Sequence, residues 1–401
     1  MSLFGRLKRR GYEWVFDPKV DAKLVDESIN HLIMDSMPQG PMIRVEPNKD
    51  DNGIEKAPNL IDTFYTLRTG QFGIKNRSPV HAFELWYDDA KTQFRFLPGD
   101  DTLRTRIEDQ IGDSYSGASV SPDTEMFPTI TEGDFIAGAK MNLFQEFYQP
   151  IKRTGGKEGW DDDPYGRLIS EMEVGQETTP SGKILRSEDV RMIVQVIFQP
   201  CKRSWGEGGV DKYLGLSVDC DTKADEMRDE TYKSGLFGFG AKEIDSTRKH
   251  KKASDQIAKQ RGEPGFWGQV RVFAISPFES VAKHRTKQIS EILETAFYNK
   301  HTEQRLDAHP LRGEALERVL RRTVTRQLGH SVWPYGLPLW SKLGTHKTLF
   351  TPAEMAGLVH LPGNEVTSDS VDWSLETTRP GVPPDVESFK PPNTEEGAPK
   401  Q

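Results

Sequence analysis

The residues that could do chemistry are scattered along this chain of 401 residues. One candidate is the glycine-rich stretch GLFGFGAK, at Gly235–Lys242. A phosphate-binding loop needs four residues between its outer glycines and then a Lys followed directly by Ser or Thr. Here Ala241 stands before Lys242, and Glu243 follows it with a charge that would repel a phosphate. We therefore interpret the stretch as a glycine loop and predict no nucleotide site.

The acidic and histidine residues suggest no metal or cofactor site. Three consecutive carboxylates end at Asp163, just before Pro164. An Asp at the N-cap with Pro at the first helical position explains that pair as a helix start. No two of the nine histidines have the spacing of metal ligands on a helix. An enzyme built from dispersed residues such as Asp161, Asp163, His284 and Glu294 remains an open alternative, because catalytic groups converge in space.

A basic run, RKHKK, could contact nucleic acid through Arg248, Lys249, Lys251 and Lys252. Such contacts are phosphate interactions that weaken as salt rises. Acidic residues flank the run and it contains no aromatic residue for base stacking, so a solvated charge run is the favoured interpretation. A nucleic-acid-binding adaptor that uses this run and a helix at Leu311–Leu328 is the alternative.

The composition favours a cytoplasmic globular protein. Hydrophobic residues make up 35% and charged residues 28%, and the net charge of −8 argues against nucleic-acid or membrane binding by the whole surface. Two cysteines, Cys201 and Cys220, form no disulfide framework. No apolar run is long enough for a transmembrane helix. The basic, partly apolar start, MSLFGRLKRR, leaves peripheral contact with a membrane surface as an alternative.

Periodicity and turn signals predict an α+β fold, with a mainly antiparallel sheet, helices on one face and ferredoxin-like β-β-α-β-α-β elements. Strands are predicted at Ala82–Tyr87, Thr92–Leu97, Val190–Pro200 and Gly265–Pro277, with one or two more within Asp134–Lys152. Predicted helices are Ala22–Met34, Ala57–Arg68, one capped by Asp100 or Asp101 that runs to Tyr115, Tyr165–Met172, Phe278–Tyr298 and Leu311–Leu328. In the last of these, Leu311, Ala315, Leu316 and Leu320 are expected to face inward.

We expect five segments along the chain: an extension at 1–57, an α+β lobe at 58–200, a partly mobile insertion at 201–263, a second α+β and helical lobe at 264–373, and a disordered tail at 374–401. The tail is acidic and rich in proline, a composition that buries too little apolar surface to fold. It would serve as a tether or docking peptide.

A well-capped short helix is predicted from the stretch LFTPAEMAGLVHLPG. Thr351 at the N-cap and Glu354 three residues later form a capping box, and Pro352 stands at the first helical position. Met355 and Leu358 form its apolar stripe. We expect this helix to close the fold, and we name Thr351, Glu354, Met355, Leu358 and Trp373 as partner-docking residues.

The order of these segments resembles a known family. The hairpin and helix at His81–Val120 contain a Q-I-x-x-x-Y phrase that ends at Tyr115. The phrases YQPIK, DP, MIVQVIFQP and GFWGQVRVFAIS follow, and then LFTPAEMAGLVHLPG and VDW. This order resembles the non-motor N-terminal region of conjugation and type IV secretion-like DNA-translocation ATPases of the HerA/FtsK class.

The resemblance implies a non-catalytic structural or adaptor component of a DNA-translocation machine. It implies a separate HerA/FtsK-class ring ATPase as the partner, with DNA or a membrane channel as further candidate contacts. The chain stops where that family's motor and phosphate-binding loop would begin, so no catalytic residue carries over, and we expect no cofactor.

Overall fold

The computed structural model describes residues 20–35, 42–51, 53–68, 77–125, 127–154, 163–174, 177–178, 182, 184–208, 217–228, 248–328 and 348–374. Across these residues ten strands form one sheet in the order β1-β6-β10-β9-β3-β4-β2-β5, with β11 beside β6 and β12 beside β10. All of its strand pairs are antiparallel. The α+β prediction with a mainly antiparallel sheet is therefore confirmed.

The strands of this sheet are β1 (Ala22–Leu24), β2 (Met42–Glu46), β3 (His81–Asp88), β4 (Lys91–Leu97), β5 (Ser119–Asp123), β6 (Phe135–Leu143), β9 (Arg191–Cys201), β10 (Gly265–Ser276), β11 (Leu306–Pro310) and β12 (Leu349–Phe350). A separate hairpin joins β7 (Glu177–Thr178) and β8 (Ile184–Leu185). The helices are α2 (Glu27–Met34), α3 (Gly53–Phe64), α4 (Asp101–Ser114), α5 (Pro164–Met172), α6 (Cys220–Arg228), α7 (Arg248–Ala258), α8 (Glu279–Ala296), α9 (Gly313–Val324) and α11 (Pro352–Leu358).

The strands at the centre of the sheet are those that the sequence predicts most clearly. β9 lies between β10 and β3, and both of its faces are buried, as its nearly continuous apolar run predicts. β3 and β4 form the predicted hairpin, with Asp89 and Ala90 in its turn at φ values of 48° and 59°. Positive φ at both central residues is typical of the type I′ turn, whose twist suits a two-residue hairpin.

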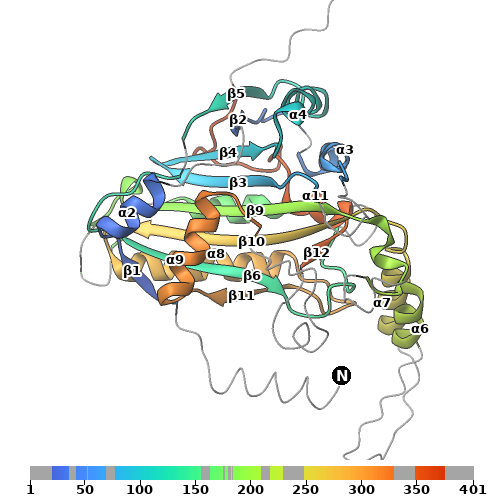
Figure 1. Ribbon diagram of the computed structural model, residues 1–401. Coiled ribbons are helices and arrows are strands. Elements are labelled where there is room, and N and C mark those ends of the chain that lie inside the picture. The colour runs from blue at the N-terminus through green and yellow to red at the C-terminus, as the bar shows by residue number, and fades with distance from the viewer. Residues whose placement is uncertain are drawn as a thin grey trace, which may run out of the picture.

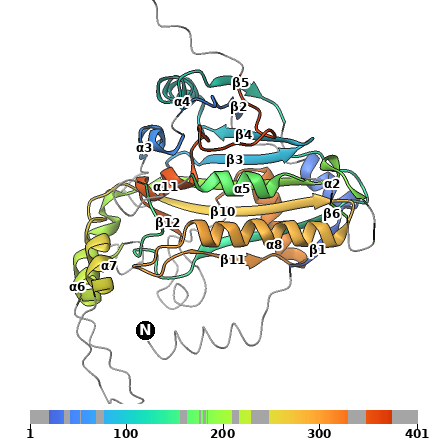
Figure 2. The same cartoon turned by 180° about the vertical axis from the view of Figure 1, so that it is seen from behind.

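Helices cover both faces of the sheet. Figure 2 shows α5, α8 and α11 over one face, and the largest apolar cluster also includes side chains of α3 and α4. Figure 1 shows α2 and α9 over the opposite face, where a smaller cluster joins them to the sheet. We call this second side the α9 face. Most of the helices thus share one face, as predicted, and α2 and α9 add a second layer.

The predicted helix Ala22–Met34 is wrong in its first part. Residues 22–24 form β1 at an edge of the sheet, paired with β6, and the helix begins only at Glu27. Asp26 explains the boundary, because its carboxylate accepts a hydrogen bond from the backbone N–H of Ile29. An N-cap residue has extended backbone, which lets the strand end and the helix begin within three residues.

The predicted segments meet in a common sheet. β10, from the expected second lobe, lies between β9 and β6 of the first, and β1 and β2 of the expected extension join the same sheet. In the expected insertion, α6 and α7 pack together beside Trp205 as a satellite of the core. The glycine loop, the N-terminal 19 residues and residues 375–401 lie outside the described part of the chain.

Helix α9 is shorter than predicted, at Gly313–Val324, and Leu311 precedes it. Leu316, Leu320 and Val324 are its buried apolar residues, at a spacing of four. Ala315 is exposed and does not face inward, because it lies one residue off this stripe.

Residues 134–152 contain one strand, β6, followed by turns. No helix in the described residues combines the length and apolarity needed to cross a bilayer.

Candidate functional site

Six polar residues form one row across six neighbouring strands, on a sheet whose other buried residues are mostly apolar. In order across β2, β4, β3, β9, β10 and β6, they are Arg44, Arg95, Glu84, Gln195, Arg271 and Lys140. Residues paired directly across an antiparallel sheet point to the same face. Trp86 contacts two members of this set and belongs to the cluster beneath α9, so the set lies on the α9 face. We call it the polar row.

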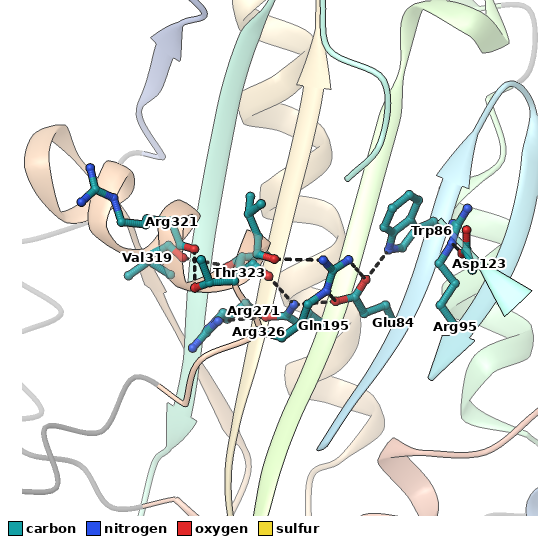
Figure 3. A network of polar contacts seen from close by, with 12 residues as sticks. Glu84, Trp86, Arg95, Asp123, Gln195, Arg271, Val319, Arg321, Thr323 and Arg326 are labelled. Carbon is teal, nitrogen blue, oxygen red and sulfur yellow. Dashed lines mark hydrogen bonds and ion pairs between the residues drawn. The ribbon is translucent and has the colours of Figure 1, made fainter. Parts of the chain in front are cut away.

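The centre of the polar row is a buried ion pair between Glu84 and Arg326. The guanidinium of Arg326 forms a fork on the carboxylate, with Nε 2.9 Å from Oε1 and Nη2 3.1 Å from Oε2 (Figure 3). Both side chains are at most 1% exposed. Trp86 and Gln195 donate further hydrogen bonds to the same carboxylate. This set of donors satisfies a charge that would be costly to bury alone.

Two members of the polar row hold the end of α9 on the sheet. Gln195 donates to the carbonyl of Thr323, and Arg271 donates to the carbonyl of Gln327, just past the helix. The last carbonyls of a helix have no partner within the helix, so these side chains complete its end. Arg326 follows directly and has a φ of 49°, in the left-handed region. The tight turn there directs its side chain back toward Glu84 (Figure 3).

At the β2 end, each cation of the polar row has an acidic partner. Arg95 forms ion pairs with Asp123 and Glu125, and its guanidinium lies 3.5 Å from the centre of the Trp86 ring. Arg44 forms an ion pair with Asp372. From β2 to β3, the row is therefore locally neutralised, and its charged groups act as internal ties between strands and loops.

The β10 and β6 end of the row has a different balance. Arg271 is fully buried, and it donates hydrogen bonds to the neutral oxygens of Gln269, Gln195 and Gln327. Burial and then the nearby charge of Arg322 lower its pKa to about 9. Lys140 makes no side-chain hydrogen bond or ion pair with any part of the chain that the structure describes. Burial, and then the charges of Arg271 and Arg322, lower its pKa. This end is cationic.

A second buried polar cluster links α5 to the end of α11. The imidazole Nε2 of His360 lies 2.9 Å from Asp163 Oδ1, and the Tyr165 ring stacks on His360 at 4.0 Å. Tyr165 donates its hydroxyl to the carbonyl of Leu358, and burial raises its pKa well above the usual value. Asp163 also caps α5, as the sequence predicts. The Tyr165 hydroxyl is occupied by a backbone carbonyl, so this cluster has a structural role. It links α5 to the end of α11, and we call it the clasp.

The residues predicted to dock a partner are mostly inside the fold. Thr351, Glu354, Met355 and Leu358 are each at most 3% exposed, so a partner could not contact them without displacing α11. The capping box is present, and Glu354 Oε1 also accepts a hydrogen bond from the backbone of Ile151. The prediction that these four residues dock a partner is therefore corrected, because their side chains pack inside the fold. Their burial agrees with the separate expectation that this helix closes the fold. Trp373 is partly buried against the main apolar cluster.

The two predicted basic elements lie apart. Figure 1 shows α7 at one end of the molecule, separate from α9. Arg248 begins α7, and Lys249 forms an ion pair with Glu303. Lys251 is exposed and Lys252 is partly buried. The structure does not join α7 with α9; it joins α9 to the cationic end of the polar row.

Among the dispersed enzyme residues, the structure does not bring His284 and Glu294 together. Asp161 lies outside the described residues, and Asp163 is bound in the clasp with His360. His284 is exposed on α8, and Glu294, ten residues later on that helix, accepts a hydrogen bond from the backbone of Ala308. Ten residues of helix separate two side chains by about 15 Å, too far for one small site. Within the described residues, no group of three acidic, His or Cys side chains could hold a metal ion.

The sequence interpretation missed the polar row, although its signal is present. In β3 and β9, the row residue stands between apolar residues two positions away on each side, and in β4 and β10 it has a Gln on one side and an apolar residue on the other. In β9, for example, Gln195 stands between Ile193 and Ile197. This residue is easily overlooked when the strand is taken as one apolar run. When the strand is divided into its two faces with a period of two, Gln195 is a polar position on one buried face. Only the register reveals that the polar positions align.

The comparisons with known proteins identify a family without an assigned function. A family model described as a domain of unknown function, DUF8128, matches residues 17–374. The chain belongs to this family. No curated protein matches it. A crystal structure of a Thermus thermophilus protein matches at 11% identity with a TM-score of 0.13, over 73% of this chain and 44% of that one. This chain thus spans less than half of that protein, and the likeness carries no argument.

Proposed function

We propose that this protein is a non-catalytic structural or adaptor component of a conjugation-like or secretion-like DNA-translocation machine. Its partner would be a separate ring ATPase of the HerA/FtsK class. The order of sequence phrases from the β3–β4 hairpin to α11 motivates this proposal. The α9 face is the observation that carries it, because Lys140 and Arg271 lie together there without ion-pair partners among the described residues, in a chain whose net charge is −8.

The architecture supports a role as a rigid body. A single ten-stranded sheet connects segments from residue 22 to residue 350, so a load applied at one edge is shared through the backbone ladder. The polar row adds side-chain hydrogen bonds that join β3, β9 and β10, between Glu84 and Gln195 and between Gln195 and Arg271. The described part of the chain thus offers a stiff platform with a cationic region at the β10–β6 end of the polar row, which suits a component placed between a motor and DNA.

A capture experiment from the native organism tests the partnership. The full-length protein, tagged and expressed at its natural level, is cross-linked in cells and purified, and co-purifying proteins are identified by mass spectrometry. The proposal predicts recovery of a ring ATPase in stoichiometric amounts. A matched chain that ends at residue 374 then tests whether the acidic tail makes the contact. Recovery of no such ATPase with either chain would contradict the partnership.

A nucleic-acid-binding adaptor that acts without a motor is the second proposal. The specific observation in its favour is the cationic end of the polar row beside α9, with Lys140 and Arg271. Capture of DNA but no ATPase in the same experiment would favour this alternative.

A further inference from the structure

The two positive charges at the β10–β6 end of the polar row form no ion pair within the described residues. Lys140 and Arg271 are paired directly across the two strands. Like charges at directly opposed positions of a sheet destabilise it, and an uncompensated buried charge costs more still. We propose that Lys140 is a phosphate-binding residue, and that the phosphates it contacts belong to the backbone of a nucleic acid.

The burial of the two side chains divides their roles. Arg271 is fully buried and uses its donors on neutral groups, so it contributes a fixed positive field. Lys140 is only partly buried. A ligand can therefore contact Lys140 directly, while the buried charge of Arg271 attracts the ligand without contacting it. Burial and the charges of Arg271 and Arg322 lower the pKa of Lys140, and a bound anion would offset these effects.

A second polar group beside Lys140 is left without a partner among the described residues. Asn142 lies two residues farther along β6, on the same face, and is only 5% exposed. Its amide oxygen makes no hydrogen bond in this part of the chain. The amide oxygen and nitrogen exchange places when the group turns over, so the same position can offer an N–H donor to an anion. Buried amides normally have partners, and this one lies where it could make a second polar contact with an anion bound to Lys140.

The surroundings favour a nucleic acid over an isolated anion. Arg322 of α9 lies close enough to lower the pKa of Lys140 by its charge. Arg318 is one helical turn before it, and both Arg318 and Arg321 lie in the exposed part of α9. Cations that recur at intervals of about 5–6 Å along a helix match a ligand with repeated phosphates better than a single ion. The choice of DNA as the ligand rests on the proposed function, whereas the anion site itself does not.

Acylation of lysines in the full-length wild-type protein gives a site-specific test. The protein is treated with acetic anhydride at pH 8, with and without a DNA duplex, and acetylation is measured at each lysine by mass spectrometry. DNA should protect Lys140. Lys283, which is paired with Glu279 and partly buried, is the matched control and should react equally in both samples. Inorganic phosphate in place of DNA tests whether a free anion is sufficient.

Binding of the same duplex by variants gives an independent measurement. The logarithm of the affinity is followed against the logarithm of the salt concentration for wild type, K140Q and K283Q. K140Q should lower the magnitude of the slope by about 0.9, the loss of one phosphate contact. K283Q should leave the slope unchanged.

The outcomes separate this inference from the proposed function. Absence of DNA binding at low salt, equal acetylation of Lys140 with and without DNA, or equal slopes for K140Q and K283Q would overturn it. Protection by inorganic phosphate without any DNA binding would overturn the nucleic acid as ligand. Capture of a ring ATPase by a protein that fails these tests would leave the partnership intact.

Discussion

The buried pair of Glu84 and Arg326 gives the sharpest prediction about stability. Replacing Arg326 with Met keeps a long apolar stem and removes the fork of hydrogen bonds. The carboxylate of Glu84 would then stay at the centre of the sheet with only the neutral donors of Trp86 and Gln195. Because Glu84 has no solvent exposure, water cannot replace the lost charge without opening the α9 face.

Removing one partner of a buried ion pair typically costs about 3–5 kcal/mol of unfolding free energy. The fork has two charge-assisted hydrogen bonds and both side chains are at most 1% exposed, so we expect R326M to lie within that range. The matched control is R321M, five residues earlier on the exposed side of α9 (Figure 3). A surface substitution of this kind should change stability by no more than about 0.5 kcal/mol.

Urea unfolding followed by tryptophan fluorescence measures the three free energies. The third variant is the neutral double replacement E84Q/R326M. Removal of both charges from a buried site is often neutral, so the double variant should be more stable than R326M alone. This inversion distinguishes a buried charge from a simple packing defect, for which two substitutions would add. If R326M and R321M unfold at the same urea concentration, or if the double variant is the least stable, the reasoning is refuted.

Three further predictions concern a carboxyl, a glycine and the thiols. Burial raises the pKa of Glu354 to about 7, against an ordinary value of 4.5. Its contribution to the free energy of unfolding is therefore complete below pH 4.5 and is lost as the pH rises through 7. E354Q should flatten this part of the dependence of stability on pH, measured by urea unfolding. G138A should cost about 1–3 kcal/mol, because its Cβ would lie 2.5 Å from the Phe273 ring, whereas G112A in open space on α4 should stabilise by about 0.5–1 kcal/mol in the same assay. Burial raises the pKa of both thiols, that of Cys220 to about 12, so a thiol reagent at pH 8 should react only as fast as the protein opens.

Local signals predict local elements well in this chain. Asp100 and Asp163 each accept a backbone hydrogen bond at the start of a helix, as their positions before α4 and α5 indicate. The capping box of α11 forms between Thr351 and Glu354. These features depend on residues within four positions of one another, so the sequence contains all the information that they need.

Features that depend on distant partners were not predicted. β5, β11 and β12 are short strands, and each becomes a strand by pairing with β2, β6 or β10. β11 contains His309 and Pro310, which give it little intrinsic preference for a strand. The fate of α11 shows the same limit: its residue types indicate a helix, but only the packing against α3 shows that its apolar stripe is already buried.

The polar row depends on both the local sequence of each strand and the pairing between distant strands, because a wrong register would separate its buried partners. A slip by one residue would move Glu84 from the α9 face to the apolar face that Phe83 and Leu85 occupy, and would leave Arg326 without its partner. Replacement of such a pair by apolar residues often costs nothing, so a specific pairing of strands is a reason to keep it. This reason holds for the members with partners. It does not hold for Lys140, because its side chain makes no polar contact with the described residues. A slipped register would therefore break no such contact of Lys140, and the presence of its charge needs an explanation outside the folded chain.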